Sequence, residues 1–239
     1  THHASSAASD VYKRQILGTW ILCPIIAGVI AMGLFTFTKR VILNRKLHIL
    51  RLDAYTRTAL LLAGAFGAYS LGANNIANVM GVFVPISPFT DVTIGNLFVF
   101  SSKEQLFLLG GLAIAVGVFT YSKRVMFTVG NDLLKMTPVA AFIVVISHSI
   151  VLFLFASQGI SAFLQSINLP SIPLVPVSSS QAVVGGVIGI CLLKGGKEVQ
   201  WSIAGRISLG WMTLPIIAAL ISLIVLFILE NIFNLTVSF

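Results

Sequence analysis

The sequence predicts an all-α integral membrane protein with several membrane-spanning helices. Of its 239 residues, 57% are hydrophobic and only 9% are charged, and the mean hydropathy is +1.00. A soluble domain carries about 25% charged residues, and a soluble fold of this size could not bury so much apolar surface. These proportions exclude an ordinary soluble enzyme, a nucleic-acid-binding domain and a disordered chain.

The charged residues and the cysteines support this interpretation. The formal net charge of +8 comes from basic residues that lie between long apolar runs and form no single basic face. We interpret them as topology signals of a membrane protein and not as contacts to a nucleic-acid backbone. The two cysteines, Cys23 and Cys191, show no CxxC spacing, so they predict neither a disulfide framework nor a metal site.

The first fifteen residues are not part of the natural protein in our interpretation. Residues 5–15 read SSAASDVYKRQ, which resembles an in-frame translation of a transposase adapter used to prepare sequencing libraries. We therefore expect residues 1–15 to be non-native and exclude His2 and His3 from any metal site. The remaining chain begins at Ile16, already inside an apolar segment, and we expect it to be a fragment of a longer reading frame.

Five stretches are long and apolar enough to cross a bilayer, which takes about 20 residues. A further stretch, 158–193, is apolar but is interrupted by three prolines and by a serine run. Irregular backbone at membrane depth is tolerated only where protein or a watery cavity covers it, so we expect this stretch to be re-entrant and to line a site. The five predicted spans are 16–38, 58–80, 105–122, 137–157 and 207–230.

The basic residues orient these spans. The connection 39–57 carries six basic residues against Asp53 alone, which predicts a cytoplasmic loop by the positive-inside rule. The loop 81–104 is predicted to lie outside, and the basic residues from 123 onward return the chain to the cytoplasm. Since Lys194 also predicts the inside, the stretch 158–193 must cross the membrane once in net terms.

One motif occurs twice. The sequence WILCPIIA begins at Trp20 and WMTLPIIA begins at Trp211, although coincidence between two isoleucine-rich helices is the alternative. The first copy runs inward toward Lys39, and the second runs outward from Arg206. One repeat in two opposite orientations is typical of transporters with inverted-topology repeats and broken helices, whose substrate binds near the midplane.

A first polar cluster lies at the end of the span 58–80. Asn74, Asn75 and Asn78 follow Gly72 in an otherwise apolar segment. We expect the helix to be unwound here, which would free backbone groups to hold an anion or a cation. The alternative is that these asparagines join helices by hydrogen bonds. Three clustered asparagines favour a site over that alternative.

A second polar cluster reads PVSSSQ from Pro176 to Gln181 and precedes three glycines, Gly185, Gly186 and Gly189. Serines after a proline resemble a helix start, with a serine cap and free N–H groups that suit an oxyanion. The glycines should let this short helix pack tightly. A capped surface loop is the alternative, and the apolar flanks argue against it.

Other polar residues give weaker signals. We interpret Lys123 and Arg124 as topology charges in preference to anion ligands, while Thr128 could support a site. For His148, a hydrogen bond between helices is favoured over a proton relay. No hydrolase or ATP-binding motif is present in the sequence, so enzymatic activity has no support.

Three motifs in this order resemble the inorganic phosphate transporter (PiT) family. They are Gly72–Asn78 (GANNIAN), Lys123–Gly130 (KRVMFTVG) and Pro176–Gln181 (PVSSSQ). The family carries a GANDxxN signature and a PVSTTH hairpin in each of two inverted halves. By this resemblance, residues 16–57 are the last helix of the first repeat plus a cytoplasmic linker, and residues 58–239 are the second repeat.

The resemblance implies a multi-pass permease of the cell (plasma or inner) membrane with a central anion site, alternating access and Na⁺ or H⁺ coupling. It implies no other cofactor and no metal centre, and it leaves open a homodimer. The partners it implies are the bilayer, the missing N-terminal half and inorganic phosphate. Coupling cations would be held at Asn75, Asn78 and Thr128. The implied substrate ligands are Asn74, Asn75, Asn78, Ser178, Ser179 and Ser180.

Two positions depart from the family pattern, because Asn75 stands at the signature aspartate and Gln181 at the hairpin histidine. Phosphate keeps a proton at neutral pH and can donate a hydrogen bond to a carboxylate, whereas sulfate cannot. A sulfate permease is therefore the second interpretation of the substrate. An anion channel or an anion-sensing receptor would use the same site in a different way. An intramembrane hydrolase using Ser147 or Ser180 with His148 is a more remote interpretation.

Overall fold

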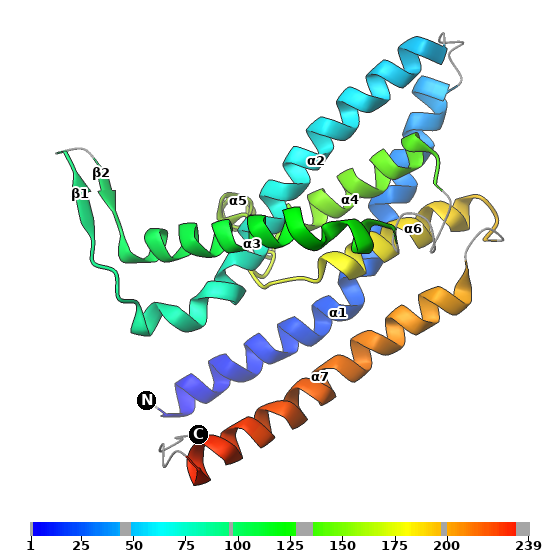
Figure 1. The fold of residues 1–239 in the computed structure, drawn as a ribbon. Helices are drawn as coiled ribbons and strands as arrows, with labels where there is room; N and C mark the ends of the chain where they lie inside the picture. The colour runs from blue at the N-terminus through cyan, green and yellow to red at the C-terminus, as the bar shows by residue number, and fades with distance from the viewer. Residues whose placement is uncertain (1, 44–48, 96–97, 128–135, 197–199, 233–239) are drawn as a thin grey trace. The chain divides into compact units, whose positions relative to one another are not determined.

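The computed structural model describes residues 2–43, 49–95, 98–127, 136–196 and 200–232. The chain divides into two compact units, Thr1–Glu198 and Val199–Phe239, and we describe each by itself. The predicted helical character is confirmed (Figure 1). The α-helices are α1 (His2–Thr38), α2 (Ile49–Met80), α3 (Ser102–Phe127), α4 (Pro138–Ala156), α5 (Gln158–Ser166) and α6 (Ser179–Leu193) in the first unit, and α7 (Trp201–Asn231) in the second.

Four helices of the described chain are long and apolar enough to cross a membrane, and they cover four of the five predicted spans. They are Asp10–Val41, Ser102–Lys123, Pro138–Ala156 and Trp201–Asn231. The fifth predicted span, 58–80, lies within α2 and is fully helical. It falls outside this group of four, which fits the three asparagines near its end. The chain is therefore an integral membrane protein.

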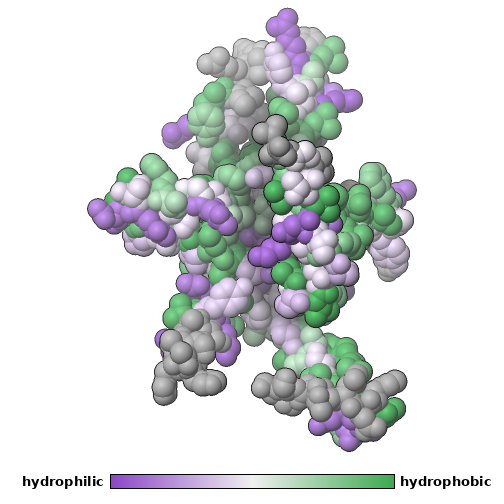
Figure 2. Space-filling model, turned by 90° about the vertical axis from the view of Figure 1, so that its left-hand side faces the viewer, coloured by the Kyte–Doolittle hydropathy of each residue, from purple (hydrophilic) through white to green (hydrophobic). Residues whose placement is uncertain are grey.

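Apolar side chains cover much of the surface. Phe119 on α3 is 91% exposed, and long rows of leucine, isoleucine and valine on α1, α3 and α7 are also exposed. Figure 2 shows many such apolar residues on one face, with hydrophilic ones between them and at the top of the view where α1 ends and α2 begins. Contiguous apolar surface on this scale marks contact with lipid or protein.

The core of the first unit is formed by α1, α2, α4 and α6 (Figure 1). Helices α1 and α6 run parallel, because Pro24 lies against Gly185 while Gly28, one turn later, lies against Gly189. Helices α2 and α4 also run parallel. Near their starts Tyr55, Ala59 and Phe142 line one apolar cavity of about 230 Å³, and further along the ring centroids of Phe66 and Phe153 are 5.5 Å apart.

Helix α6 runs antiparallel to α4. Gly186 faces Ser147, whereas Ala182, one turn earlier in α6, shares a buried cluster with Val151 and Phe155 near the end of α4. Since α4 is parallel to α2, the directions alternate as the charge pattern predicts. The spans 58–80 and 137–157 run one way, and the final part of 158–193 runs back.

The predicted interruption of residues 158–193 is confirmed. Helix α5 is short and is capped by Ser157, whose hydroxyl accepts a hydrogen bond from the Ile160 N–H at 3.2 Å. An irregular segment follows, in which Asn168 has a φ of 56°. Helix α6 then has 15 residues, a length of about 22 Å, which is less than the roughly 30 Å of hydrocarbon in a bilayer.

The expected unwinding at Asn74–Asn78 is wrong, because α2 continues without a break to Met80. Asn75 turns its amide back onto its own helix and donates to the Leu71 carbonyl at 3.1 Å. The helix changes only at Gly81–Ile86, which form a 3₁₀ helix containing Pro85. Proline has no N–H, so the α-helical bond to the Gly81 carbonyl cannot form.

The predicted outer loop 81–104 contains a small β-hairpin that the all-α prediction does not include. Strands β1 (Val92–Ile94) and β2 (Phe98–Phe100) pair antiparallel, and Gly95 beside the turn has a φ of 63°. Their β-branched and aromatic residues favour this conformation. Two helices also start earlier than expected, α1 at His2 instead of residue 16 and α2 at Ile49 instead of residue 58.

Candidate anion site

The polar part of α2 meets the start of α6. Asn74 is only 7% exposed, and its Oδ1 accepts a hydrogen bond from the backbone N–H of Val177 at 3.0 Å. Val177 immediately precedes Ser178, the N-cap of α6. Two polar clusters that are 103 residues apart in the chain therefore lie together, and Asn74 fixes their distance.

The first turn of α6 is capped as predicted. The Ser178 Oγ accepts a hydrogen bond from the Gln181 N–H at 3.4 Å, and the hydroxyls of Ser178 and Ser180 are 3.0 Å apart. The N–H groups of the first helical turn have no carbonyl of their own helix to bond. They carry the positive end of the helix dipole, which suits an oxyanion.

Helix α1 supports this turn from one side. The Cys23 Sγ lies 3.6 Å from the Ser178 carbonyl oxygen and donates a weak hydrogen bond to it. A Cβ at Gly185 would lie 2.7 Å from the Pro24 carbonyl carbon, and one at Gly189 would lie 2.8 Å from the Gly28 Cα. The predicted tight packing of these two glycines is confirmed, and it holds the middle and the later part of α6 against α1.

The other predicted ligands do not take part in the hydrogen bond that joins α2 to the segment before α6. Asn75 is half-buried and bonded to its own helix, Asn78 is exposed, and Ser179 is half-buried. Within the described residues, Asn74 joins the serine turn by a hydrogen bond, whereas Asn75 and Asn78 make no such bond to it. Thr128, the third predicted cation ligand, lies outside the described residues.

Gln181 is a feature of the site that sequence reasoning does not assign to it. Its side chain is 5% exposed, and its Oε1 has no hydrogen-bond partner within the described structure. The spacing Ser178-x-x-Gln181 matches a capping box, in which the glutamine would return a bond to the serine N–H. This spacing could have pointed to Gln181 from the sequence. The structure, however, does not form the bond from the Ser178 N–H to the Gln181 side-chain oxygen.

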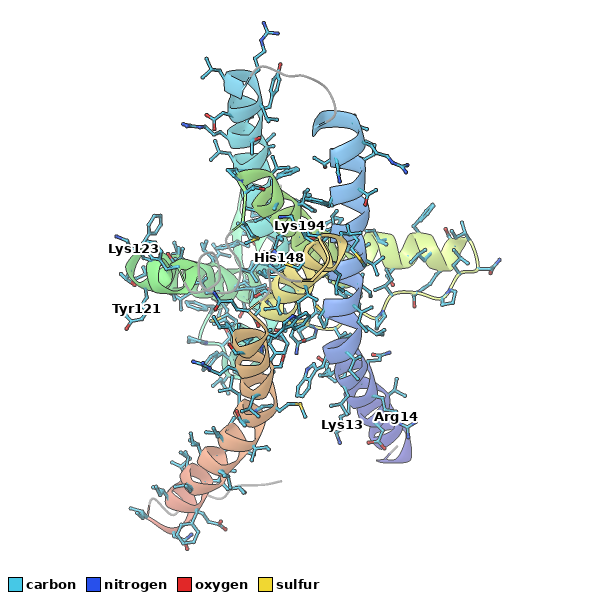
Figure 3. All side chains as sticks on the ribbon, turned by 90° about the vertical axis from the view of Figure 1, so that its right-hand side faces the viewer. Lys13, Arg14, Tyr121, Lys123, His148 and Lys194 are labelled. Carbon is cyan, nitrogen blue, oxygen red and sulfur yellow. The ribbon has the colours of Figure 1, made fainter. Side chains whose placement is uncertain are left out.

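His148 lies in the middle of the bundle formed by α1, α2, α4 and α6 (Figure 3). Its Nε2 is buried and has no partner in the described part of the chain, so this atom does not form the predicted bond between helices. The hydroxyls of Ser147 and Ser149 donate to carbonyls of their own helix at 2.9 and 2.6 Å. By contrast, Lys123 projects from α3 into open space (Figure 3).

The donor set around α6 consists of neutral groups. Among the described residues, no group of three or more histidine, cysteine, aspartate or glutamate side chains lies close enough to hold a metal ion. The polar atoms at the site are amide, hydroxyl and backbone groups. Such groups can bind an oxyanion by donation and can offer oxygen atoms to an alkali cation.

Comparison with known proteins shows several relatives. A protein of Methanocaldococcus jannaschii named "Putative phosphate permease" is 29% identical over 219 residues, which are 91% of this chain and 61% of the relative. A protein of the same name from Pyrococcus abyssi is 32% identical over 177 residues, 72% of this chain and 39% of the relative. The human "Sodium-dependent phosphate transporter 1" is 27% identical over 161 residues, 65% of this chain and 21% of the relative.

The chain spans at most 61% of the length of these relatives. No solved structure matches it significantly. The Phosphate transporter family matches residues 3–162 and 167–237, a range that covers most of the chain and begins before residue 5, where the segment that resembles an adapter starts. On this match, the chain belongs to the Phosphate transporter family, whose members are membrane transporters and not enzymes.

Proposed function

We propose that the chain is part of a secondary active transporter that carries inorganic phosphate across a membrane together with Na⁺ or H⁺. The observation that carries this proposal is the 3.0 Å hydrogen bond between Asn74 and the Val177 N–H. It brings the two clusters expected to hold the anion to one place. Family membership supports the substrate, since relatives are named for phosphate.

The chemistry of the site fits a transported anion. An oxyanion entering the apolar core loses its water shell, and this loss is costly unless hydrogen bonds replace the water. The first turn of α6 offers backbone N–H groups, and the hydroxyls of Ser178, Ser179 and Ser180 add further donors. Because these donors are neutral, the anion would be held without an ion pair and could be released on the other side.

The architecture supports alternating access. We propose that α5, the irregular segment and α6 form a re-entrant hairpin, since α6 is too short to cross the hydrocarbon alone. The repeated WxxxPIIA motif places Pro24 in α1 and Pro215 in α7, and we interpret these helices as members of two inverted repeats. In that architecture one half moves against the other around a site near the midplane.

Sulfate is the second candidate substrate. Asn75 has no carboxylate to accept a proton from phosphate, and the groups that meet at α6 are neutral. A site made only of donors would hold a fully ionised anion at least as well as a protonated one. The choice between the two substrates therefore depends on whether an acceptor faces the anion.

Uptake into liposomes tests the function. The chain, produced with any sequence that precedes or follows it in its gene, would be reconstituted, and labelled phosphate uptake measured with and without inward Na⁺ or H⁺ gradients. We expect saturable uptake that one gradient drives and that excess sulfate does not abolish. Uptake that is abolished by sulfate, with labelled sulfate itself carried, would indicate a sulfate permease. Gradient-independent, non-saturating flux would indicate a channel.

A further inference from the structure

Gln181, at the start of α6, has a buried side-chain oxygen that makes no hydrogen bond to any described residue. It is 5% exposed, and its Oε1 has no solvent contact and no hydrogen-bond partner in the residues that the structure describes. Its backbone is held in the first turn by the Ser178 Oγ at 3.4 Å. The side chain is therefore fixed at the same helix end as the proposed anion donors.

The position of Gln181 in the first turn of α6 leads us to expect its amide near that end. Long side chains in a helix lean back toward the N-terminus, over the turn that precedes their own Cα. By this tendency, the amide of a residue in the first turn lies beside the N-cap and not deeper in the core. Gln181 also lies four residues before Gly185, which packs on Pro24, so both residues share the face of α6 that meets α1.

A buried acceptor without a donor is costly. Leaving one unpaired costs the desolvation of that group, and an apolar side chain of the same shape would avoid the cost. A capping box would offer one donor to this oxygen, the Ser178 N–H, yet Oε1 does not take it. An oxygen that is buried and unpaired at a binding site is suited to a donor that arrives with the ligand.

Hydrogen phosphate is a ligand that brings such a donor. Its ionised oxygens accept hydrogen bonds from the serine hydroxyls and the N–H groups of α6, while its protonated oxygen can only be satisfied by an acceptor. Sulfate is fully ionised at neutral pH and has no proton to give. Sulfate would therefore leave the Gln181 oxygen without a hydrogen bond.

We propose that Gln181 is the specificity-determining residue of the anion site, and that its Oε1 accepts the hydrogen bond of the protonated oxygen of phosphate and thereby excludes sulfate. This assignment rests on the proposed transport of phosphate. It gives the site the acceptor that Asn75 cannot supply as a carboxylate. Sites that hydrogen-bond a substrate hydroxyl reject analogues without it strongly, because the buried partner is left unpaired.

The test compares Gln181→Met, which keeps the length of the side chain but removes the acceptor, with Gln165→Met on the exposed surface of α5. Equilibrium binding of inorganic phosphate, arsenate and sulfate would be measured on each purified protein at pH 7. Arsenate has the shape of phosphate and also keeps a proton. We expect wild type and Gln165→Met to bind phosphate and arsenate and to reject sulfate.

For Gln181→Met we expect phosphate and arsenate affinity to fall about tenfold or more, with sulfate affinity unchanged or higher. If the ratio of phosphate affinity to sulfate affinity in Gln181→Met equals that of wild type, the role assigned to Gln181 is wrong, while the proposed transport function is not affected. Wild-type protein that binds no phosphate would overturn the proposed function and the assignment with it. Gln181→Asn, which keeps a shorter amide, should retain more of the preference for phosphate than Gln181→Met.

Thermal unfolding without ligand separates this role from a structural one. If Oε1 is unpaired until the ligand binds, Gln181→Met removes an unpaired buried acceptor. The melting temperature of this variant should then equal or exceed that of wild type. Added phosphate should then stabilise wild type more than the variant. A marked fall in the melting temperature of ligand-free Gln181→Met would show that the glutamine holds the fold, which contradicts the assignment.

Discussion

Asn74 is the residue that ties α2 to α6. Its Oδ1 accepts a hydrogen bond from the Val177 N–H just before the serine cap, and both residues are buried. Removing this acceptor leaves a buried N–H unpaired, and such a loss costs about 1–3 kcal/mol. The free energy of unfolding should therefore respond to this side chain more than to its neighbours.

We predict that Asn74→Leu lowers the free energy of unfolding by about 1–3 kcal/mol, while Asn78→Leu changes it by less than about 0.5 kcal/mol because Asn78 is exposed. Both variants place the same side chain on the same helix, one turn apart. Thermal unfolding of the purified proteins in one detergent measures the difference. Equal losses would mean that the Asn74 bond has no special role.

At this scale the sequence predicts which residues are polar and clustered, but not how each is used. The three asparagines form one group in the sequence. The structure separates them into a buried bridge at Asn74, a bond within α2 at Asn75 and an exposed side chain at Asn78. Spacing along a helix sets which residues share a face, whereas the face that turns inward is set by packing against other helices.

The contact between α1 and α6 sets the position of the anion site at the level of elements. Gly185 and Gly189 let the two helix backbones approach so closely that no Cβ fits at either position without a shift. Small residues permit such approach between membrane helices. The prolines and the serine run predict where the stretch 158–193 breaks, and the structure agrees.

We predict that Gly185→Leu destabilises the protein by about 3 kcal/mol or more, because the side chain would meet the backbone of α1 at Pro24. Gly33→Leu is the matched control, since nothing lies within 4 Å of a Cβ at Gly33. The yield of monodisperse protein and its melting temperature measure the effect. A Gly185→Leu protein as stable as Gly33→Leu would contradict the packing described here.

Helix continuity shows where sequence reasoning about elements fails. The asparagines after Gly72 predict unwinding at Asn74–Asn78, yet α2 continues to Met80 and changes only where Pro85 follows. Glycine permits an irregular backbone, but proline enforces one by removing a donor. The β-hairpin escapes prediction for another reason, because strands of three residues are too short to show a periodic pattern.

At the scale of the whole molecule, the main feature is the direction in which successive helices cross the membrane. Charge asymmetry predicts that the connection 39–57 is inside and the loop 81–104 outside, and the parallel and antiparallel packing of α2, α4 and α6 agrees with this alternation. The native cysteines, Cys23 and Cys191, are both buried. These two cysteines should therefore react weakly with thiol reagents, which makes single cysteines introduced into this chain informative.

We predict that Thr93→Cys, on β1, is labelled by a membrane-impermeant maleimide in intact cells, because Thr93 is exposed in the loop predicted to lie outside. Arg57→Cys, at the start of the predicted span 58–80, should be labelled only after permeabilisation. Labelling of intact and permeabilised cells, followed by gel shift, measures both. The opposite pattern would reverse the topology, and labelling of both from one side would mean that residues 58–80 do not cross.

An oxyanion site between the end of α2 and the start of α6 is the feature on which the proposed function depends most. Asn78 follows Asn74 by one turn on the same face of α2. It is exposed and Ser179 is half-buried, so truncating either should leave the packing of the bundle intact. Isothermal titration of inorganic phosphate into wild type, Asn78→Ala and Ser179→Ala tests this site most directly. Hydrogen bonds to a charged group contribute about 1.5–3 kcal/mol, so we predict that each variant binds phosphate about tenfold or more weakly while staying folded. Wild-type affinity in both variants would contradict the assignment of the site.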